Sequence, residues 1–323
     1  MHLVLLRNSV CLLVAEVTKF RRYKTPPASC EARSQGRPSV QNEAQTLREA
    51  ESHDFESRDG IALHCLTWNV DRDEKQTTRA PVVLLHGGGA NAHWWDLMAG
   101  ELAQYGPVYA LDFRGHGDSS YPEDRFVGAF NTDLESILSW LGRDDIFLVG
   151  HSMGAAVALD HSSRFPATRA IALVDLARGG PPGGGRRARL ALAHRRSYRS
   201  REDAVTRYRF LPESSHPDES IRSYIATHSV RAEPDGRFGY KFDPKWFNLP
   251  SRPRPILSTI RCPTLLVRGA DSPLLGIEAA RDFISQIPTG QLIEVPDAGH
   301  HVLIDQPVLL VKALNIFFES CTD

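Results

Sequence analysis

Ser152 lies at the centre of a Gly-x-Ser-x-Gly pattern and is the best candidate for a nucleophile in this chain. The apolar residues 146–149 precede the pattern and predict a strand, and residues 155–159 follow it and predict a helix. A serine on a tight turn between strand and helix projects its hydroxyl alone at the end of a sheet. Gly150 and Gly154 leave the room that such a turn requires. A chance match in a glycine-rich loop would lack these flanking elements.

A serine hydroxyl needs a base to take its proton before it becomes a useful nucleophile. A strand predicted over residues 291–295 is followed by a loop and then by a helix predicted over residues 305–318. The loop contains His300 in the pattern Gly-His-x(4)-Asp-x-Pro. We therefore predict His300 as the base, with His301 as the alternative.

The imidazole of such a base is oriented by a carboxylate from another strand end of the same sheet. Asp271 follows a strand predicted over residues 264–269 and is our choice. Asp175, at the end of a strand predicted over residues 170–174, is the alternative. Either choice gives the chain order Ser, Asp, His, which disfavours the two major serine protease folds.

A third requirement is a pair of backbone donors for the negative oxygen of a tetrahedral intermediate. An apolar strand predicted over residues 81–85 ends in one histidine and three glycines. We assign one donor to the N–H of Gly88, with Gly89 as the alternative, and the other to the N–H of Met153. His86 is expected to brace this loop by hydrogen bonding.

The substrate-binding wall is assigned to Trp95 and His151. Trp94 and Trp95 follow the glycine loop, and at least one of them is expected to pack beside it. His151 directly precedes the candidate nucleophile. The sequence does not distinguish an acyl pocket from ordinary core packing here.

These motifs together resemble the α/β-hydrolase fold superfamily. Residues 112–119 add the pattern Asp-x-Arg-Gly-x-Gly-x-Ser, which is typical after the fourth strand of its single-domain members. The resemblance runs from about residue 51 to the C-terminus and is weakest between residues 177 and 255. It implies an α/β fold with a mostly parallel eight-stranded sheet, flanking helices and a helical cap insertion, with the catalytic residues at the carboxyl ends of the strands.

Four segments follow from this reading. Residues 1–50 are expected to be a poorly ordered N-terminal extension, because residues 25–49 are rich in polar residues and proline. Residues 51–176 and 255–323 form the two parts of the hydrolase core, and residues 177–254 form the cap. The core begins with a hairpin that turns at Asp59-Gly60.

The cap is expected to begin with a hinge, because residues 179–185 are almost all glycine and proline. Helical segments are predicted near residues 186–196, 201–210 and 219–228. The arginines of the first segment favour a solvated helix face over a site for an anionic substrate. The position of the insertion predicts a role in substrate choice.

Composition limits the partners and the compartment. The 323 residues carry a formal net charge of −1, which argues against general affinity for nucleic acid. The apolar stretch at residues 3–17 is too short for a membrane span, so no stable membrane insertion is expected. The five cysteines lack metal-ligand spacing. We expect reduced thiols, a cytoplasmic location, and no metal, nicotinamide or flavin cofactor.

The resemblance implies a serine hydrolase that cleaves a carboxylic ester of small to medium size through an acyl-enzyme. A serine nucleophile disfavours the haloalkane dehalogenase and epoxide hydrolase branches, whose ester intermediate requires a carboxylate. The alternatives are a meta-cleavage product hydrolase acting on a carbon–carbon bond, a lactonase or a thioesterase. A ligand receptor that retains the triad is the non-enzymatic alternative. The expected partner is a small ester, and the sequence carries no signal for an oligomeric state.

Overall fold

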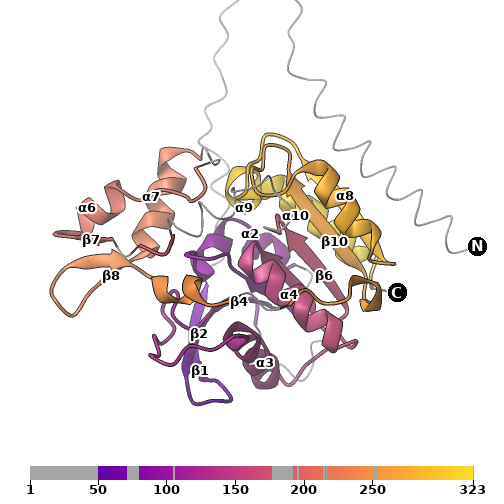
Figure 1. Cartoon of the computed structure of the whole chain (residues 1–323), viewed down its shortest axis with the longest axis horizontal. Coiled ribbons are helices and arrows are strands. Elements are labelled where there is room, and N and C mark those ends of the chain that lie inside the picture. The colour runs from indigo at the N-terminus through magenta and orange to yellow at the C-terminus, as the bar shows by residue number, and fades with distance from the viewer. Residues whose placement is uncertain are drawn as a thin grey trace, which may run out of the picture. The chain divides into compact units, whose positions relative to one another are not determined.

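The strand that leads into Ser152 lies inside an eight-stranded sheet with the order β1-β2-β4-β3-β5-β6-β10-β11 (Figure 1). The computed structural model describes residues 50–322 except 71–79, 105, 177–191, 195, 214, 216, 251 and 252. The predictions for residues 1–49, for the hinge and for most of the helix at 186–196 lie outside the described residues. The strands are β1 (Glu51–Glu56), β2 (Ala62–Trp68), β3 (Val82–Leu85), β4 (Val108–Asp112), β5 (Phe147–His151), β6 (Ala170–Val174), β10 (Thr264–Gly269) and β11 (Gly290–Val295).

The pairing of the strands confirms the predicted sheet. β1 and β2 form the expected antiparallel hairpin, with Gly60 at a φ of 79° in its turn. β2 also pairs antiparallel with β4, and the remaining neighbours are parallel. The central strands β3, β5 and β6 are buried along their whole length, which is why their sequences are nearly continuous apolar runs.

Helices cover both faces of this sheet. Residues of α3 (Ala129–Leu141), α4 (Met153–Arg164) and α8 (Ile277–Ser285) share one core cluster with the strands. α2 (Asp96–Leu102) and α10 (Pro307–Glu319) pack against each other. The shorter helices are η3 (Ala92–Trp95), η5 (Leu257–Thr259) and α9 (Val302–Asp305).

The sequence predicts a helical insertion, but the described part of the insertion is not purely helical. Besides α6 (Arg201–Thr206), α7 (Glu219–His228) and η4 (Pro244–Asn248), it contains a three-stranded antiparallel sheet in the order β7-β9-β8. The strands of this sheet are β7 (Ser197–Tyr198), β8 (Val230–Ala232) and β9 (Phe238–Tyr240). Strands of two or three residues are too short to produce a recognisable alternation in the sequence.

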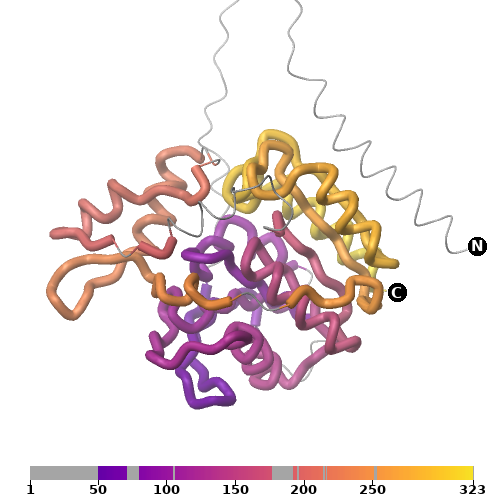
Figure 2. Tube along the Cα trace, viewed as in Figure 1, coloured from indigo at the N-terminus to yellow at the C-terminus, as the bar shows by residue number. Residues whose placement is uncertain are grey.

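The described parts of the chain that returns from the insertion to the core pass α4, as the orange trace in Figure 2 shows. This return begins with a bridge between Phe242 and His116. Asp243 then accepts a hydrogen bond from Arg125 Nε at 2.9 Å and donates its N–H to Gly115 at 2.7 Å. These contacts attach the start of the return to the core.

Across the residues that the structure describes, no helix has both the length and the apolar character needed to cross a membrane.

Candidate active site

Ser152 occupies a sharp turn between β5 and α4, as the sequence predicts. Its φ of 50° and ψ of −105° are strained for a residue with a side chain. A Cβ atom at position 150 would overlap the backbone of Gly154, and a Cβ at position 154 would overlap the carbonyl of Leu85. Glycine at both positions is therefore what allows α4 to start so close to the sheet.

The side chains of three residues form a hydrogen-bonded chain at this turn. His300 Nε2 lies 3.0 Å from Ser152 Oγ, and His300 Nδ1 lies 2.7 Å from Asp175 Oδ1. A carboxylate only accepts hydrogen bonds, so Nδ1 carries the proton and Nε2 is the nitrogen that can accept the serine proton. His300 and Asp175 are buried, whereas Ser152 is partly exposed. This is the geometry of a nucleophile, a base and an orienting acid.

The prediction of Asp271 as the orienting acid is wrong. Its side chain is exposed, and its backbone N–H donates to Ala298 at 2.9 Å. Asp175 occupies the position instead because β6 is the direct neighbour of β5, so the end of β6 lies beside the catalytic turn. The chain order Ser, Asp, His is unchanged by this correction.

Two further groups hold the Asp175 carboxylate in place. Ser272 Oγ donates to Oδ1 at 2.6 Å, and the N–H of Gly269 donates to Oδ2 at 2.9 Å. Ser272 is a residue that the sequence reasoning missed. The only sequence feature that pointed to Ser272 was its position beside Asp271 after the end of β10. A serine there can have many other roles, so this position alone did not assign one.

The proposed oxyanion donors face the same cavity as the nucleophile. Gly88 and Met153 both line this cavity, whereas Gly89 lies outside its lining. Met153 is the first residue of α4, where backbone N–H groups have no partner within the helix and attract negative charge. These placements are compatible with the expected roles of Gly88 and Met153.

His86 braces the glycine loop, as predicted. Its Nε2 accepts the N–H of Phe113 at 3.1 Å, so its Nδ1 donates to the carbonyl of Gly87 at 2.7 Å. Burial lowers the pKa of His86, and the nearby Asp112 offsets only part of that effect. The neutral imidazole therefore ties the end of β3 to the residue after β4.

Of the two residues predicted for the substrate-binding wall, one lines the cavity and the other does not. Trp95 is fully buried and does not line the cavity, so its assignment is wrong, whereas Trp94 lines it. Consecutive residues of a 3₁₀ helix point about 120° apart, so only one of the two tryptophans faces the cavity. His151 lines the cavity and donates from Nε2 to the carbonyl of His300 at 3.0 Å. Burial, followed by the nearby His300, lowers the pKa of His151 well below its usual value.

His301, the alternative base, contacts the insertion instead of the nucleophile. Its Nδ1 lies 2.8 Å from Ser215 Oγ, and its Nε2 donates to the carbonyl of Leu211 at 3.2 Å. Ser215 Oγ also lies 3.2 Å from Asp305 Oδ2. This group joins the insertion to the loop that carries His300.

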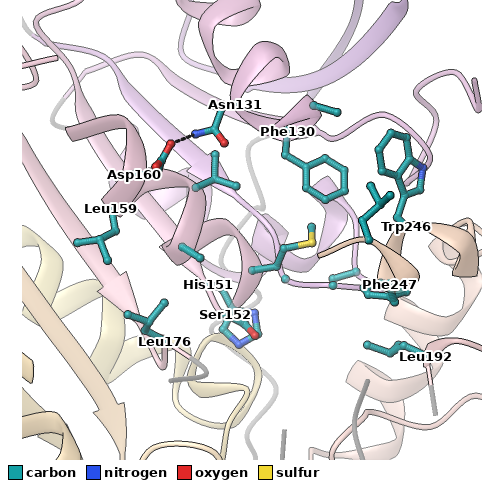
Figure 3. Close-up of a pocket in the computed structure, with 18 of the residues that line it drawn as sticks. Phe130, Asn131, His151, Ser152, Leu159, Asp160, Leu176, Leu192, Trp246 and Phe247 are labelled. Carbon is teal, nitrogen blue, oxygen red and sulfur yellow. Dashed lines mark hydrogen bonds between the residues drawn. The ribbon is translucent and has the colours of Figure 1, made fainter. Parts of the chain in front are cut away.

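The cavity at Ser152 has a volume of about 360 Å³ and a mainly apolar lining (Figure 3). One group of side chains in the described residues has metal-compatible spacing: His64, Asp112 and Asp118. His64 Nδ1 and Asp112 Oδ2 already share a hydrogen bond of 2.8 Å. Burial lowers the pKa of His64, but Asp112 outweighs that effect and raises it overall. This pair does not line the catalytic cavity and stabilises the turn after β4.

Known proteins agree with this fold. A protein from Sus scrofa, named 1-acylglycerol-3-phosphate O-acyltransferase ABHD5, is 36% identical over 110 residues, but the match spans only 30% of its length and 31% of this chain. The sn-1-specific diacylglycerol lipase ABHD11 of Mus musculus is 26% identical over 255 residues, which cover 74% of this chain and 81% of the lipase.

A crystal structure of an alpha/beta hydrolase from Novosphingobium aromaticivorans superposes with a TM-score of 0.69 at 26% identity, over 84% of this chain and 98% of that one. The family model described as "Alpha/beta hydrolase family" matches residues 82–313, which contain Ser152, Asp175 and His300. The chain therefore belongs to the alpha/beta hydrolase family.

Proposed function

We propose that this protein is a serine hydrolase that cleaves a carboxylic ester through an acyl-enzyme. The observation that carries the proposal is the position of His300, whose two ring nitrogens lie within hydrogen-bonding distance of Ser152 and of the buried Asp175. The similarity to a diacylglycerol lipase over most of the chain supports ester cleavage. The cavity volume fits a substrate of small to medium size.

In the first half of the reaction, Ser152 Oγ attacks the ester carbonyl carbon while His300 Nε2 takes the hydroxyl proton. Asp175 stabilises the resulting imidazolium, and the N–H groups of Gly88 and Met153 donate to the negative oxygen. The tetrahedral intermediate then breaks its bond to the alkoxy oxygen. His300 returns the proton to that oxygen, so the alcohol leaves neutral and the acyl group stays on Ser152.

In the second half, water replaces the alcohol. His300 takes a proton from the water as its oxygen attacks the acyl carbon, and a second tetrahedral intermediate forms. Its collapse breaks the bond to Ser152 Oγ, which regains its proton from His300. The carboxylic acid is released, and the enzyme returns to its starting state.

A panel of p-nitrophenyl esters, thioesters, lactones and meta-cleavage dienones tests this proposal. We expect repeated turnover of esters, with many product molecules released per protein molecule. Faster turnover of a dienone or a thioester under matched conditions would replace the ester assignment. A single stoichiometric release followed by a stable conformational change would instead favour a ligand receptor.

A further inference from the structure

A second, smaller cavity of about 40 Å³ adjoins the catalytic cavity. The two cavities share four lining residues, which are Gly88, Trp94, Leu192 and Leu211. The glycine loop after β3 passes from one cavity to the other, because Gly87 lines the catalytic cavity, Gly88 lines both and Gly89 lines the second. A ligand at Ser152 that follows this loop would therefore enter the second cavity.

The second cavity differs from the catalytic cavity in its charge. His194, Arg196 and Arg209 line it, and the described residues around it include no Asp or Glu. The catalytic cavity is lined by Asp160 and, within the described part of the chain, by no arginine or lysine. All three basic residues of the second cavity are exposed, so an anion from solvent can reach them. The sequence predicts a solvated helix face for the arginines of residues 186–196, but Arg196 also lines this cavity.

The guanidinium of Arg209 is held in place by the backbone. Its Nη1 donates to the carbonyl of Thr206 at 3.0 Å and to that of Tyr208 at 2.7 Å. Among the residues that the structure describes, none accepts a hydrogen bond from its Nε or Nη2. Glu219 does not line the cavity, and its carboxylate accepts from Arg222 Nε at 2.8 Å. A guanidinium that is already fixed and keeps donors available loses less entropy when it binds an anion.

Arg196 comes from a different part of the insertion. It directly precedes β7, and Tyr240 ends β9, the partner strand of β7. Burial, followed by the neighbouring Tyr198, raises the pKa of Tyr240, and the charge of Arg196 offsets part of that rise. The guanidinium of Arg196 therefore lies near a phenol that lines the same cavity. Two arginines beside one small cavity repel each other, and an anion between them would remove that repulsion.

We propose that the second cavity binds a carboxylate carried by the ester substrate, with Arg196 and Arg209 as its partners. A volume of about 40 Å³ holds about three water-sized groups, which is the size of a carboxylate. The planar guanidinium presents pairs of donors that match the two oxygens of a carboxylate. The substrates are then esters with a carboxylate remote from the bond that is cleaved. This inference rests on the proposed function and names a substrate class for that site.

The test compares esters with and without an added carboxylate. Monomethyl esters of the dicarboxylic acids from succinate to sebacate are matched with methyl esters of the monocarboxylic acids of equal length. A second series places the carboxylate in the alcohol half, as butanoate esters of hydroxy acids matched with butanoate esters of simple alcohols. In at least one series the carboxylate should raise kcat/KM by about tenfold, the low end for hydrogen bonds to a charged group, because the arginines are exposed. No preference in either series would overturn the proposal.

Variants of the two arginines locate the preference. Arg196→Gln and Arg209→Gln should each bring the ratio of kcat/KM between the matched esters close to one. Arg207→Gln is the control, because Arg207 is exposed on the same segment as Arg209 and does not line the cavity. It should change the ratio by less than about twofold. An equal fall of the ratio in Arg207→Gln would indicate a general attraction by the charge of the insertion and would contradict the site.

Binding measurements keep this test separate from the proposed function. Calorimetry on the Ser152→Ala protein should show that at least one dicarboxylate of the series binds more tightly than the monocarboxylate of equal length. Adding Arg209→Gln should remove the difference. If esters turn over but the carboxylate changes neither turnover nor binding, the carboxylate site is wrong and the hydrolase assignment stands. If no ester turns over, the hydrolase assignment fails, and dicarboxylate binding alone decides the carboxylate site.

Discussion

Asp175 accepts hydrogen bonds from His300, Ser272 and the backbone of Gly269, whereas the carboxylate of Asp271 is exposed. Asp175→Asn replaces an acceptor with an amide and disturbs the tautomer of His300, so kcat should fall by about 10⁴-fold. Asp271→Asn is the matched control and should change kcat by less than about twofold. Steady-state ester hydrolysis measures both. The opposite ranking would return the role of the acid to Asp271.

At the scale of elements, the turn between β5 and α4 depends on close backbone approach. A methyl group at position 154 would overlap the carbonyl of Leu85, so Gly154→Ala should lower the free energy of unfolding by about 1–3 kcal/mol. Gly276→Ala is the control, because a Cβ there meets no atom within 4 Å among the described residues. Urea unfolding of both variants provides the comparison. Equal midpoints would show that the turn tolerates the added methyl group.

At the scale of elements, part of the fold and of the site could be predicted from the sequence alone. β3, β5, β6 and β10 were predictable because each is a local apolar run, and Ser152 and His300 because each follows such a run within a short motif. The choice between Asp175 and Asp271 was not local. Both follow a strand, and only the order of strands in the sheet places one of them beside the catalytic turn.

The cavity itself was also beyond the sequence. Whether Trp94 or Trp95 faces the cavity depends on the residue at which η3 begins. A shift of that start by one residue would exchange the directions of the two side chains. The catalytic cavity combines residues from three separate segments, which are residues 126–131, α4 and the segment that contains Trp246 and Phe247. No pattern within one segment predicts its contacts with segments elsewhere in the chain.

At the scale of the whole molecule, the fold buries several histidines in neutral form. Burial is the largest cause of a lowered pKa at His86, His116, His151, His161 and His301. The pKa falls to about 3 at His116 and to about 4 at His161. Below about pH 6.5 the unfolded chain binds protons that the folded protein does not, so folding loses stability as the pH falls.

We therefore expect the free energy of unfolding to fall as the pH is lowered from about 6.5 towards 4, by up to about 1.4 kcal/mol per pH unit for each of these histidines. The raised pKa of His64 acts in the opposite direction, because it stabilises the folded state at low pH and loses that effect as the pH rises. Urea unfolding at a series of pH values measures the sum. Stability that did not decrease over this range would contradict the neutral burial of these side chains.

His161 isolates one of these contributions. Its ring stacks on Phe165 with centroids 4.5 Å apart, so His161→Phe keeps an aromatic ring in place and removes the titration. The variant should lose less stability than the original protein between pH 6.5 and the folded pKa of about 4. Parallel pH dependences for the two proteins would show that His161 takes up its proton equally well in the folded state.

The central claim is that Ser152 is a nucleophile activated by His300, and covalent labelling tests it most directly. A fluorophosphonate probe reacts with an activated serine and leaves a stable mass increase. Intact-protein mass spectrometry should show one label per chain, and peptide mapping should place it on Ser152. Ser152→Ala should abolish the label and lower ester turnover by about 10⁴- to 10⁶-fold. A label that persists in Ser152→Ala, or that maps to another residue in the unaltered protein, would contradict the account.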